Sequence, residues 1–346
     1  MTSEPQAHTS PEAEEAPLRS RSRASVVRRA LRNPQLQLGI VVLAPTLLWY
    51  FVLQVAPVLE AFWFALYHVQ LLDLSSWADL IQSSYFVGAL HFEHLFDPRL
   101  NPQFWPGTLR SLIWTALQFV YVLPLGLGLS VALARITRWR TLYQVAILVP
   151  FATPTTAAAL MMGKLFDPVT GGINATLRAA GLSTSQWLHD PILALPLAAA
   201  IGAWRWLGFY IIIMTAGILN IPKDIGEAAE IDGADRWGRF WLITLPLLGH
   251  ILTLISVLLL VNSMQEYTLP YTLTGGSQQF TMGQFQPIDY GPSDSLVLLN
   301  LALYKQTFGG AFVAFGPASA GAVLELIFVL LGSLLLLKAL RPKWSY

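Results

Sequence analysis

The stretch EAAEIDGADRWGRFWLITLP, from Glu227 to Pro246, is a polar segment between apolar runs that are long enough to cross a bilayer. Two acidic residues and a pair of alanines open it, Gly233 interrupts it, and an Arg/Trp/Phe run leads into the next apolar segment. A polar, helix-forming loop of this kind is suited to contact something outside the membrane. What it contacts depends on the side of the membrane on which it lies.

The composition is that of an integral membrane protein. The chain has 346 residues, of which 54% are hydrophobic and 12% are charged, whereas a soluble domain carries about 25% charged residues. It has no cysteine, which excludes disulfides and thiolate metal sites. It also has no G-x-x-x-x-G-K-[ST] stretch, so it does not bind ATP through a P-loop.

Six apolar runs predict an all-α integral membrane fold with six transmembrane helices. Each run has about 20 residues or more, enough at about 1.5 Å per residue to cross a hydrocarbon core about 30 Å thick. We place these spans at residues 37–60 (extending as far as 66), 110–134, 142–164, 191–219, 243–265 and 316–338.

Residues 1–34 have the composition of a disordered cytoplasmic tail. They are rich in Pro, Ser, Ala and Glu and contain six arginines. This tail is either a solvated topogenic segment or a regulatory or lipid-binding one. The apolar stretch that follows is too long for a signal peptide and lacks a small-residue cleavage site, so it is an uncleaved first span. The remaining residues, 35–346, form the predicted transmembrane domain.

Basic residues predict the orientation of the spans. With the tail inside, fifteen Lys and Arg residues flank the spans on the inner side and four on the outer side, and such residues are enriched on the cytoplasmic side. Both termini and the Glu227 loop are therefore expected in the cytoplasm. From Lys223 to Arg239 the loop has three basic and five acidic residues. This acidity suits anionic lipid poorly and favours a protein partner; the alternative is an ordinary amphipathic interfacial loop.

The loop sequence predicts a short helix-turn-helix. Pro222 is suited to the first helical position and Asp224 to the first turn. Gly233 can adopt a positive φ and end the first helix. A second helix is expected to begin at Ala234 and to run towards the membrane.

This stretch resembles the loop motif of binding-protein-dependent ABC importer permeases. The fixed positions are EAA, three residues, Gly233, nine residues, Ile243, one residue and then Leu245-Pro246. Asp232 also fits the extended form, EAA-x-x-DGA. The resemblance covers roughly residues 85–340 and favours the carbohydrate-importer branch. The stretches that support this branch include VGALHFEHLFD at 87–97, LVPFATPTTAAALMM at 148–162, TAGILNIP at 215–222 and LTGG at 273–276.

Two positions depart from the pattern of that family. His250 stands where the family often has a proline, and Arg110-Ser111 replaces the usual Asn-Thr near the start of the second span. Both departures lie outside the loop motif. They therefore weaken the assignment of an exact subfamily but leave the loop motif itself unchanged.

The resemblance implies that residues 220–242 form a coupling loop whose helix inserts into a cleft of a cytoplasmic ATPase subunit. In that role Glu227 bonds to the ATPase, Ala228 and Ala229 allow close packing, and Gly233 makes the turn. The motif is completed by Asp232, Ile243, Leu245 and Pro246. ATP and Mg²⁺ are expected in the ATPase subunits, so this chain itself is expected to carry no catalytic residue, cofactor or metal.

The resemblance further implies a permease subunit of an ATP-driven sugar importer, working by alternating access in a bacterial or archaeal cell membrane. The expected partners are a second permease subunit, two ATPase subunits, an extracytoplasmic sugar-binding protein and the lipid bilayer, with no nucleic acid. One alternative is the same architecture importing glycerol phosphate, a polyamine or an anion. Another is an ATPase-independent secondary transporter or membrane scaffold.

Polar residues within the spans are candidates for the substrate path, because ionisable groups in membrane segments are costly. Arg205 and Glu325 either pair with each other, or one lines a solvated path, or Glu325 is protonated or closer to the outer interface. The end of the fifth span adds Asn262, Gln265, Glu266 and Tyr267. This cluster suits the hydroxyls and rings of a sugar, or it simply marks the exit from the membrane.

The predicted outer segments 67–109, 165–190 and 266–315 contain many aromatic residues, and the last of them is predicted to form a helix over 295–308. Such aromatics either lie at the lipid headgroups or contact an external protein. His91 and His94 flank Glu93 in the first of these segments. A metal site needs further ligands and supporting hydrogen bonds, so we expect none there.

Overall fold

The computed structural model describes residues 34–69, 84–274, 292–308 and 315–340. It divides into two compact units, one ending at Glu60 and the other beginning at Ala61, and we describe each by itself. Apart from its last residue, the tail predicted for residues 1–34 lies outside the described residues. So does part of the predicted outer segments.

One long apolar helix dominates the described part of the first unit. It is built from α2 (Pro34–Tyr50), a π-helical turn at Phe51–Val55 and α3 (Ala56–Leu66), which runs across the boundary between the units. The π-helical turn lies just before Pro57. Proline lacks an N–H and its ring displaces the carbonyl four residues earlier, here that of Leu53, so the backbone widens at that turn. The 30 residues from Gln37 to Leu66 are long and apolar enough to span a membrane.

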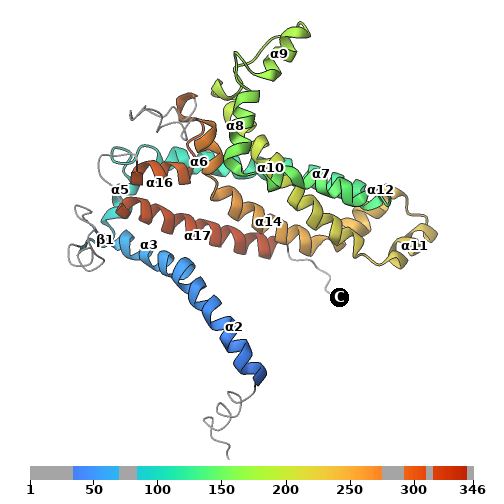
Figure 1. The fold of residues 1–346 in the computed structure, drawn as a ribbon, viewed down its shortest axis with the longest axis horizontal. Helices are drawn as coiled ribbons and strands as arrows, with labels where there is room; N and C mark the ends of the chain where they lie inside the picture. The colour runs from blue at the N-terminus through green and yellow to red at the C-terminus, as the bar shows by residue number, and fades with distance from the viewer. Residues whose placement is uncertain (1–33, 70–83, 275–291, 309–314, 341–346) are drawn as a thin grey trace, which may run out of the picture. The chain divides into compact units, whose positions relative to one another are not determined.

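The second unit is a bundle of long helices (Figure 1). Its main members are α6 (Phe104–Arg135), α7 (Arg140–Ala152), α10 (Ala194–Leu219), α14 (Gly249–Met264) and α17 (Phe315–Ala339). Helix α10 packs against α6 and α7, and α14 packs against α6 and α17. Large buried side chains such as Trp114, Tyr210 and Ile255 fill the space between them. The all-α prediction is therefore confirmed, apart from two short strands.

Two of the six predicted spans are broken. The predicted span 142–164 consists of α7 and α8 (Thr155–Leu165), which are bent by 90° relative to each other. Thr153 is extended at this break because the ring of the following Pro154 disfavours a helical conformation there. The predicted span 243–265 is likewise bent, by 66°, between Leu247 and Gly249. The described residues thus hold four apolar helices of spanning length, or six spans if each bent pair is counted as one.

A glycine permits the close approach of α7 and α10. A Cβ atom at Gly208 of α10 would overlap the carbonyl oxygen of Ile147 in α7. Phe151 then stacks on Phe209 with ring centroids 5.0 Å apart. This contact fixes the first half of the broken span against the bundle.

Shorter elements connect the long helices. They are β1 (Tyr67–His68) paired antiparallel with β2 (Tyr85–Phe86), α5 (Leu90–Phe96), α9 (Gly172–Ala179), a 3-10 turn at Trp187–His189, α15 (Thr268–Leu273), a 3-10 turn at Pro292–Asp294 and α16 (Leu299–Phe308). The helix predicted over 295–308 thus begins later than expected, at Leu299.

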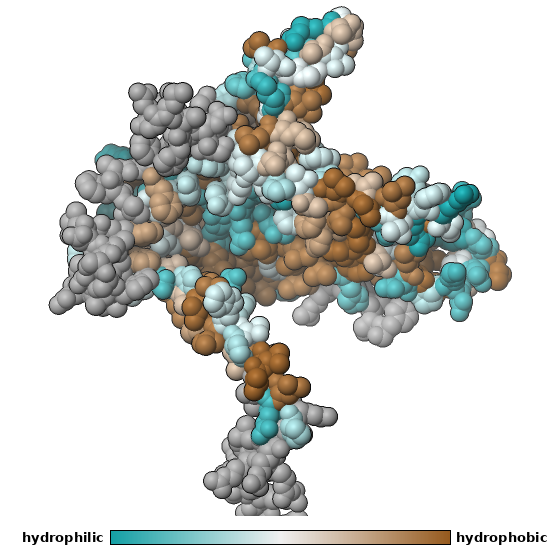
Figure 2. All heavy atoms as spheres, in the orientation of Figure 1, coloured by the Kyte–Doolittle hydropathy of each residue, from teal (hydrophilic) through white to brown (hydrophobic). Residues whose placement is uncertain are grey.

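Polarity is distributed unevenly over this unit. Figure 2 shows hydrophobic residues over much of the bundle and hydrophilic residues gathered at the end that carries α11 (Lys223–Ile231) and α12 (Arg236–Arg239). The start of α6 and the start of α17 lie at the opposite end (Figure 1). The predicted coupling loop is therefore one end of the bundle.

Candidate functional site

The turn in the coupling loop is a complete Schellman motif. The N–H of Ala234 donates to the carbonyl of Ala229 at 2.9 Å, and the N–H of Gly233 donates to that of Glu230 at 3.1 Å. These two bonds satisfy carbonyls that the end of a helix leaves free. Gly233 has φ +79°, which glycine adopts without steric cost. The predicted role of Gly233 as the end of the first helix is thus confirmed by its geometry.

The second half of the loop restarts with its own cap. The Asp235 side chain accepts the N–H of Gly238 at 2.7 Å, the usual N-cap bond to the third residue of a helix. Arg239 forms an ion pair with Glu230 across the turn. The chain continues as a π-helical turn at Phe240–Thr244 and α13 (Leu245–Leu247). Here again a proline, Pro246, follows the π-helical turn.

The loop residues divide between an outer and an inner face. Glu227, Ala228 and Asp232 are exposed, so they are free to contact a partner. Ala229 is only 8% exposed, which means that it packs against its own chain. Of the two alanines expected to allow close packing, Ala228 lies on the free surface and Ala229 packs within the chain; their roles towards an ATPase stay a prediction.

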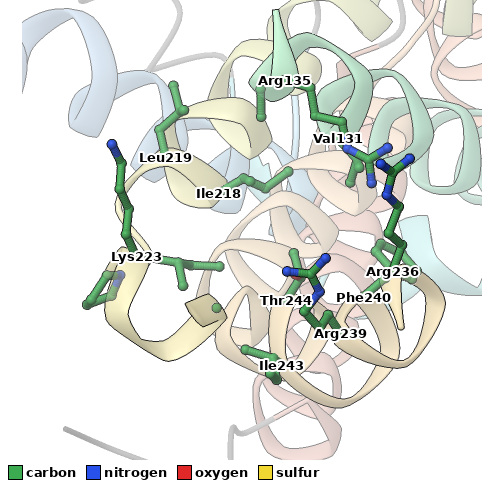
Figure 3. Close-up of a pocket in the computed structure, with 14 residues that line it drawn as sticks. Val131, Arg135, Ile218, Leu219, Lys223, Arg236, Arg239, Phe240, Ile243 and Thr244 are labelled. Carbon is green, nitrogen blue, oxygen red and sulfur yellow. The ribbon is translucent and has the colours of Figure 1, made fainter. Parts of the chain in front are cut away.

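A pocket of about 460 Å³ lies beneath the loop (Figure 3). It is bounded by the last turns of α6 and α10, the start of α11, and the segment from α12 through the π-helical turn. Ile243 of the motif lines it, whereas Leu245 and Pro246 follow in α13. The motif therefore contributes both to the exposed face of the loop and to a cavity behind it.

A second, much smaller pocket lies within the bundle, with about 10 Å³ of space, enough for about one water molecule. Two of the predicted substrate-path residues, Asn262 and Glu266, line it. The other lining residues are Trp114, Gln118, Gly202, Trp206, Tyr210, Leu259 and Ser263. Aromatic rings and amide and carboxylate groups thus meet at one point between α6, α10 and α14.

Hydrogen bonds hold the polar groups of this small pocket. The Asn262 amide donates to the Tyr210 hydroxyl at 3.4 Å, and the Gln118 amide donates to the Ala199 carbonyl at 2.9 Å. The Glu266 carboxylate accepts the backbone N–H of Leu269 at 3.0 Å. These bonds orient the side chains while each amide and carboxylate keeps further hydrogen-bonding capacity.

The other two predicted residues of that cluster do not enter the pocket. Gln265 is exposed. Tyr267 is 40% exposed, and its ring stacks on Tyr304 with centroids 5.8 Å apart. The predicted substrate cluster is therefore divided, with Asn262 and Glu266 directed inward and the other two directed away.

Arg205 and Glu325 do not form the ion pair considered above. Arg205 is 9% exposed, and its guanidinium carbon lies 4.8 Å from the centroid of the Trp206 ring. The carboxylate that acts electrostatically on it is Glu266. Glu325 is 6% exposed and accepts a hydrogen bond from the Asn300 amide at 2.9 Å. Of the three alternatives that the sequence left open, the pairing of these two groups is therefore not formed, and each has a different neighbour.

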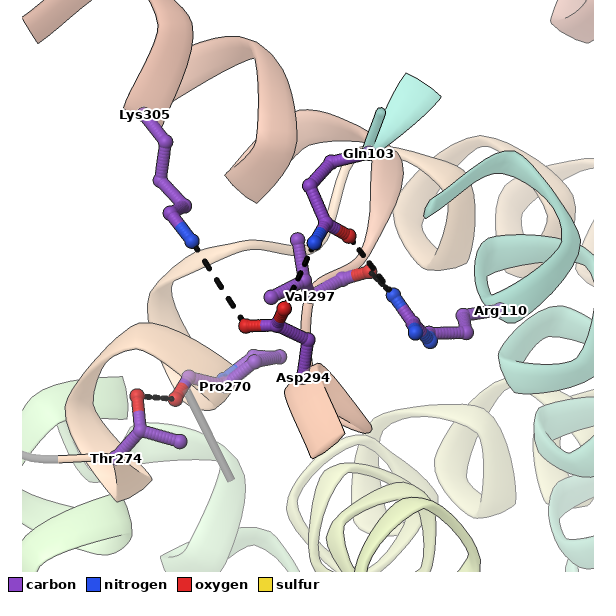
Figure 4. A network of polar contacts seen from close by, with 7 residues as sticks. All are labelled: Gln103, Arg110, Pro270, Thr274, Asp294, Val297 and Lys305. Atoms are coloured by element: carbon purple, nitrogen blue, oxygen red, sulfur yellow. Dashed lines mark hydrogen bonds and ion pairs between the residues drawn. The ribbon is translucent and has the colours of Figure 1, made fainter. Parts of the chain in front are cut away.

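Arg110 and Ser111, which depart from the family's usual pair, hold the segment before α16. The Ser111 hydroxyl oxygen accepts the N–H of Leu299 at 2.8 Å, and Arg110 lies within 3.5 Å of the Val297 carbonyl oxygen. In Figure 4, Gln103, Asp294 and Lys305 extend this network. Polar contacts therefore tie the first turns of α6 to the segment that leads into α16.

Sequence reasoning missed several residues of these sites. Trp114, Gln118 and Tyr210 line the small pocket, and Asn300 holds Glu325. An amide inside an apolar run, as at Gln118, is a signal that could have indicated the first group. No group of three or more metal-ligating side chains occurs among the described residues.

A family model described as "Binding-protein-dependent transport system inner membrane component" matches residues 124–345. The trehalose/maltose transport system permease protein MalF of Thermococcus litoralis is 27% identical over 311 residues, which are 90% of this chain and 96% of that protein. The arabinooligosaccharides transport system permease protein AraP of Bacillus subtilis is 28% identical over 255 residues, 73% of this chain and 75% of that protein.

A solved structure supports the same fold. It is a crystal structure of a bacterial ABC transporter involved in the import of the acidic polysaccharide alginate. The match has a TM-score of 0.70 and 20% sequence identity, and it covers 92% of this chain and 100% of that chain. The predicted all-α fold of an ABC importer permease is therefore confirmed, whereas the cytoplasmic location of both termini stays a prediction.

Proposed function

Because this chain belongs to the family of inner membrane components of binding-protein-dependent transport systems, we propose that it is a permease subunit of an ATP-driven sugar importer. Family membership and several apolar helices make it a multi-pass protein of the inner membrane. Sugar as the solute is supported by relatives named for trehalose, maltose and arabinooligosaccharides.

The observation that carries this proposal is the built coupling loop. A capped turn and an ion pair hold its two short helices together, and the exposed face presents Glu227, Ala228 and Asp232. A carboxylate beside a small side chain allows a partner backbone or basic group to come close. We assign this face to a cytoplasmic ATPase subunit that binds ATP and Mg²⁺. With six spans, we propose that both termini of this chain lie in the cytoplasm as well.

The small pocket in the bundle is the proposed constriction of the sugar path. Its aromatic rings suit the apolar faces of pyranoses, and Asn262, Glu266 and Gln118 suit their hydroxyls. About 10 Å³ is far too small for a sugar, so the path is closed at this point in the described conformation. Rigid-body movement of helices, of the kind that alternating access requires, must open it.

The remaining proposed partners follow from this arrangement. They are a second permease subunit that completes the path, a second ATPase subunit and a sugar-binding protein on the outer side. The solved structure of a bacterial alginate ABC transporter in complex with an alginate pentasaccharide-bound periplasmic protein matches this chain with a TM-score of 0.67, which supports the last of these.

Co-purification in mild detergent tests the proposal. The chain is tagged in its native host, the accompanying subunits are identified by mass spectrometry, and the accompanying binding protein is screened against a panel of mono- and oligosaccharides. We expect an ATPase, a second permease and a sugar-dependent increase in the melting temperature of the binding protein. Solute uptake by this chain alone, without ATP, would contradict the proposal.

A further inference from the structure

The pocket beneath the coupling loop differs in charge from the loop's outer face. The loop as a whole has more acidic than basic residues, yet no acidic residue lines the pocket. All the charged residues that line it are basic: Arg135, Lys223, Arg236 and Arg239. The fold therefore separates the loop's charges, with carboxylates such as Glu227 on the free surface and basic groups around the cavity.

Among the described residues, three of these basic groups, Arg135, Lys223 and Arg236, have no carboxylate within salt-bridge distance. Only the fourth, Arg239, forms an ion pair, with Glu230. Figure 3 shows the guanidinium groups of Arg135, from α6, and Arg236, from α12, directed towards one another. Like charges that face each other repel unless an anion lies between them.

The rest of the pocket wall is largely apolar. It consists mainly of Val131, Ala134, Ile218, Leu219, Ile221, Phe240 and Ile243. The volume of about 460 Å³ falls within the range of about 300–1,000 Å³ that is usual for ligand pockets. A ligand that matches both parts has an anionic head and an apolar body.

The pocket also lies at the right place for a lipid. It sits at the ends of α6 and α10, where two apolar helices of spanning length stop. Basic pockets between transmembrane helices at this level are suited to phosphate headgroups. A soluble phosphate compound would use the arginines but would leave the apolar wall uncovered.

We propose that this pocket binds an anionic phospholipid, with Arg135 and Arg236 on the phosphate and the acyl chains along the apolar wall. A bound headgroup would bridge α6 to α12 and so steady the coupling loop against the bundle. The excess of acidic residues in the loop favoured a protein partner over anionic lipid. This holds for the outer face of the loop, where the carboxylates lie, but not for the pocket beneath it, where the charged residues are basic. The inference does not depend on which solute is transported.

Native mass spectrometry of the full chain, purified with its accompanying subunits, tests this proposal. The protein is titrated with phosphatidylglycerol, with phosphatidylcholine and, separately, with inorganic phosphate. We expect the wild type to retain phosphatidylglycerol. Retention should be about fivefold weaker for Arg135→Gln and for Arg236→Gln, because one basic residue near an anionic lipid contributes about that factor to the affinity.

Arg138→Gln is the matched control, because Arg138 lies three residues after Arg135 and outside the pocket. It should retain phosphatidylglycerol like the wild type. Equal retention of phosphatidylglycerol by the pocket variants and the control would overturn the proposal. Binding of inorganic phosphate as strong as that of phosphatidylglycerol would also overturn it, because the site would then belong to a soluble anion. If a variant fails to fold, a competition experiment on the wild type replaces it. Displacement of bound phosphatidylglycerol by phosphatidylcholine would show that the pocket does not select an anionic headgroup and would overturn the proposal.

Discussion

The N–H of Ala234 donates a hydrogen bond to the carbonyl oxygen of Ala229 at 2.9 Å, and this bond closes the turn between the two helices of the coupling loop. The bond forms only because Gly233, which lies between the two residues in sequence, takes a left-handed conformation. Ala229 is buried at the same time. One short segment thus fixes both the turn and the packing of the loop, and it leaves Glu227 and Ala228 free at the surface.

Gly233→Ala should weaken the coupling loop through the backbone alone. A Cβ there would meet no atom within 4 Å, so no clash contributes. The left-handed conformation costs an L-residue about 1–2 kcal/mol. We expect lower transport-coupled ATPase activity in the reconstituted transporter, with unchanged insertion into the membrane.

Gly226→Ala is the matched control for that variant. Gly226 lies within α11, also with open space around its Cα, and its φ is outside the positive range. Alanine in a helix is favoured over glycine by about 1 kcal/mol. Unchanged or higher activity is expected; a loss equal to that of the Gly233 variant would contradict the role given to the left-handed turn.

Ser111→Ala should destabilise the end of the bundle that lies opposite the coupling loop. The Ser111 hydroxyl is the acceptor for the N–H of Leu299, and a buried donor left without a partner costs about 1–3 kcal/mol. The melting temperature of the purified chain measures this. Ser130→Ala is the control, because Ser130 is equally buried in the same helix but only donates to the Leu127 carbonyl. Equal losses in both variants would contradict the specific role of Ser111.

Asn262→Ala should raise the KM of uptake, by about fivefold for one lost neutral hydrogen bond. Asn262 lines the small pocket, whereas Gln265, three residues later, is exposed. Gln265→Ala should therefore leave uptake unchanged. Each variant loses a side-chain amide. Similar KM values for both would therefore show that the small pocket does not lie on the sugar path.

Acidification should destabilise the chain through His91. Burial lowers the pKa of His91 below its ordinary value of 6.5, although its contact with the Tyr67 carbonyl acts in the opposite direction. Above pH 6.5 both folded and unfolded states hold the ring neutral. Below pH 6.5 the His91 ring takes up a proton in the unfolded state before it does so in the folded state. The free energy of unfolding therefore falls, by at most about 1.4 kcal/mol per pH unit, until the pH reaches the lowered pKa of the folded state.

The melting temperature between pH 7.5 and 5.5 measures this effect. His91→Phe removes the titrating group and should flatten the pH dependence, even if its absolute stability is lower. An unchanged slope in the His91 variant would show that other groups are responsible.

The elements that sequence predicted well are those set by local chemistry. Long apolar runs predicted the bundle, and Gly233 predicted the turn because few residues other than glycine occupy that conformation readily. The loop motif predicted the family. Each of these depends on residues close together in the chain.

The features that the sequence did not predict depend on contacts between residues that are far apart in the chain, or on a backbone angle that the local sequence permits but does not determine. Pro154 permits a bend, but its 90° angle follows from packing against other elements. A pairing of Arg205 with Glu325 was one of three alternatives that the sequence left open, and in the structure the Arg205 guanidinium lies over the Trp206 ring instead. Asn300 lies 25 residues before its partner Glu325, and no sequence pattern joined the two.

Recovery of the ATPase subunit with the tagged chain measures whether the exposed face of the coupling loop contacts the ATPase. Glu227 is an exposed carboxylate on the outer face of the loop, and Glu227→Lys reverses its charge without touching the turn or the pocket. Glu93→Lys is the control, since Glu93 is exposed on α5, away from the loop. We expect Glu227→Lys to lose most of the ATPase at equal membrane yield and Glu93→Lys to retain it. Full ATPase recovery with Glu227→Lys would show that the exposed carboxylate of the loop does not bind the ATPase.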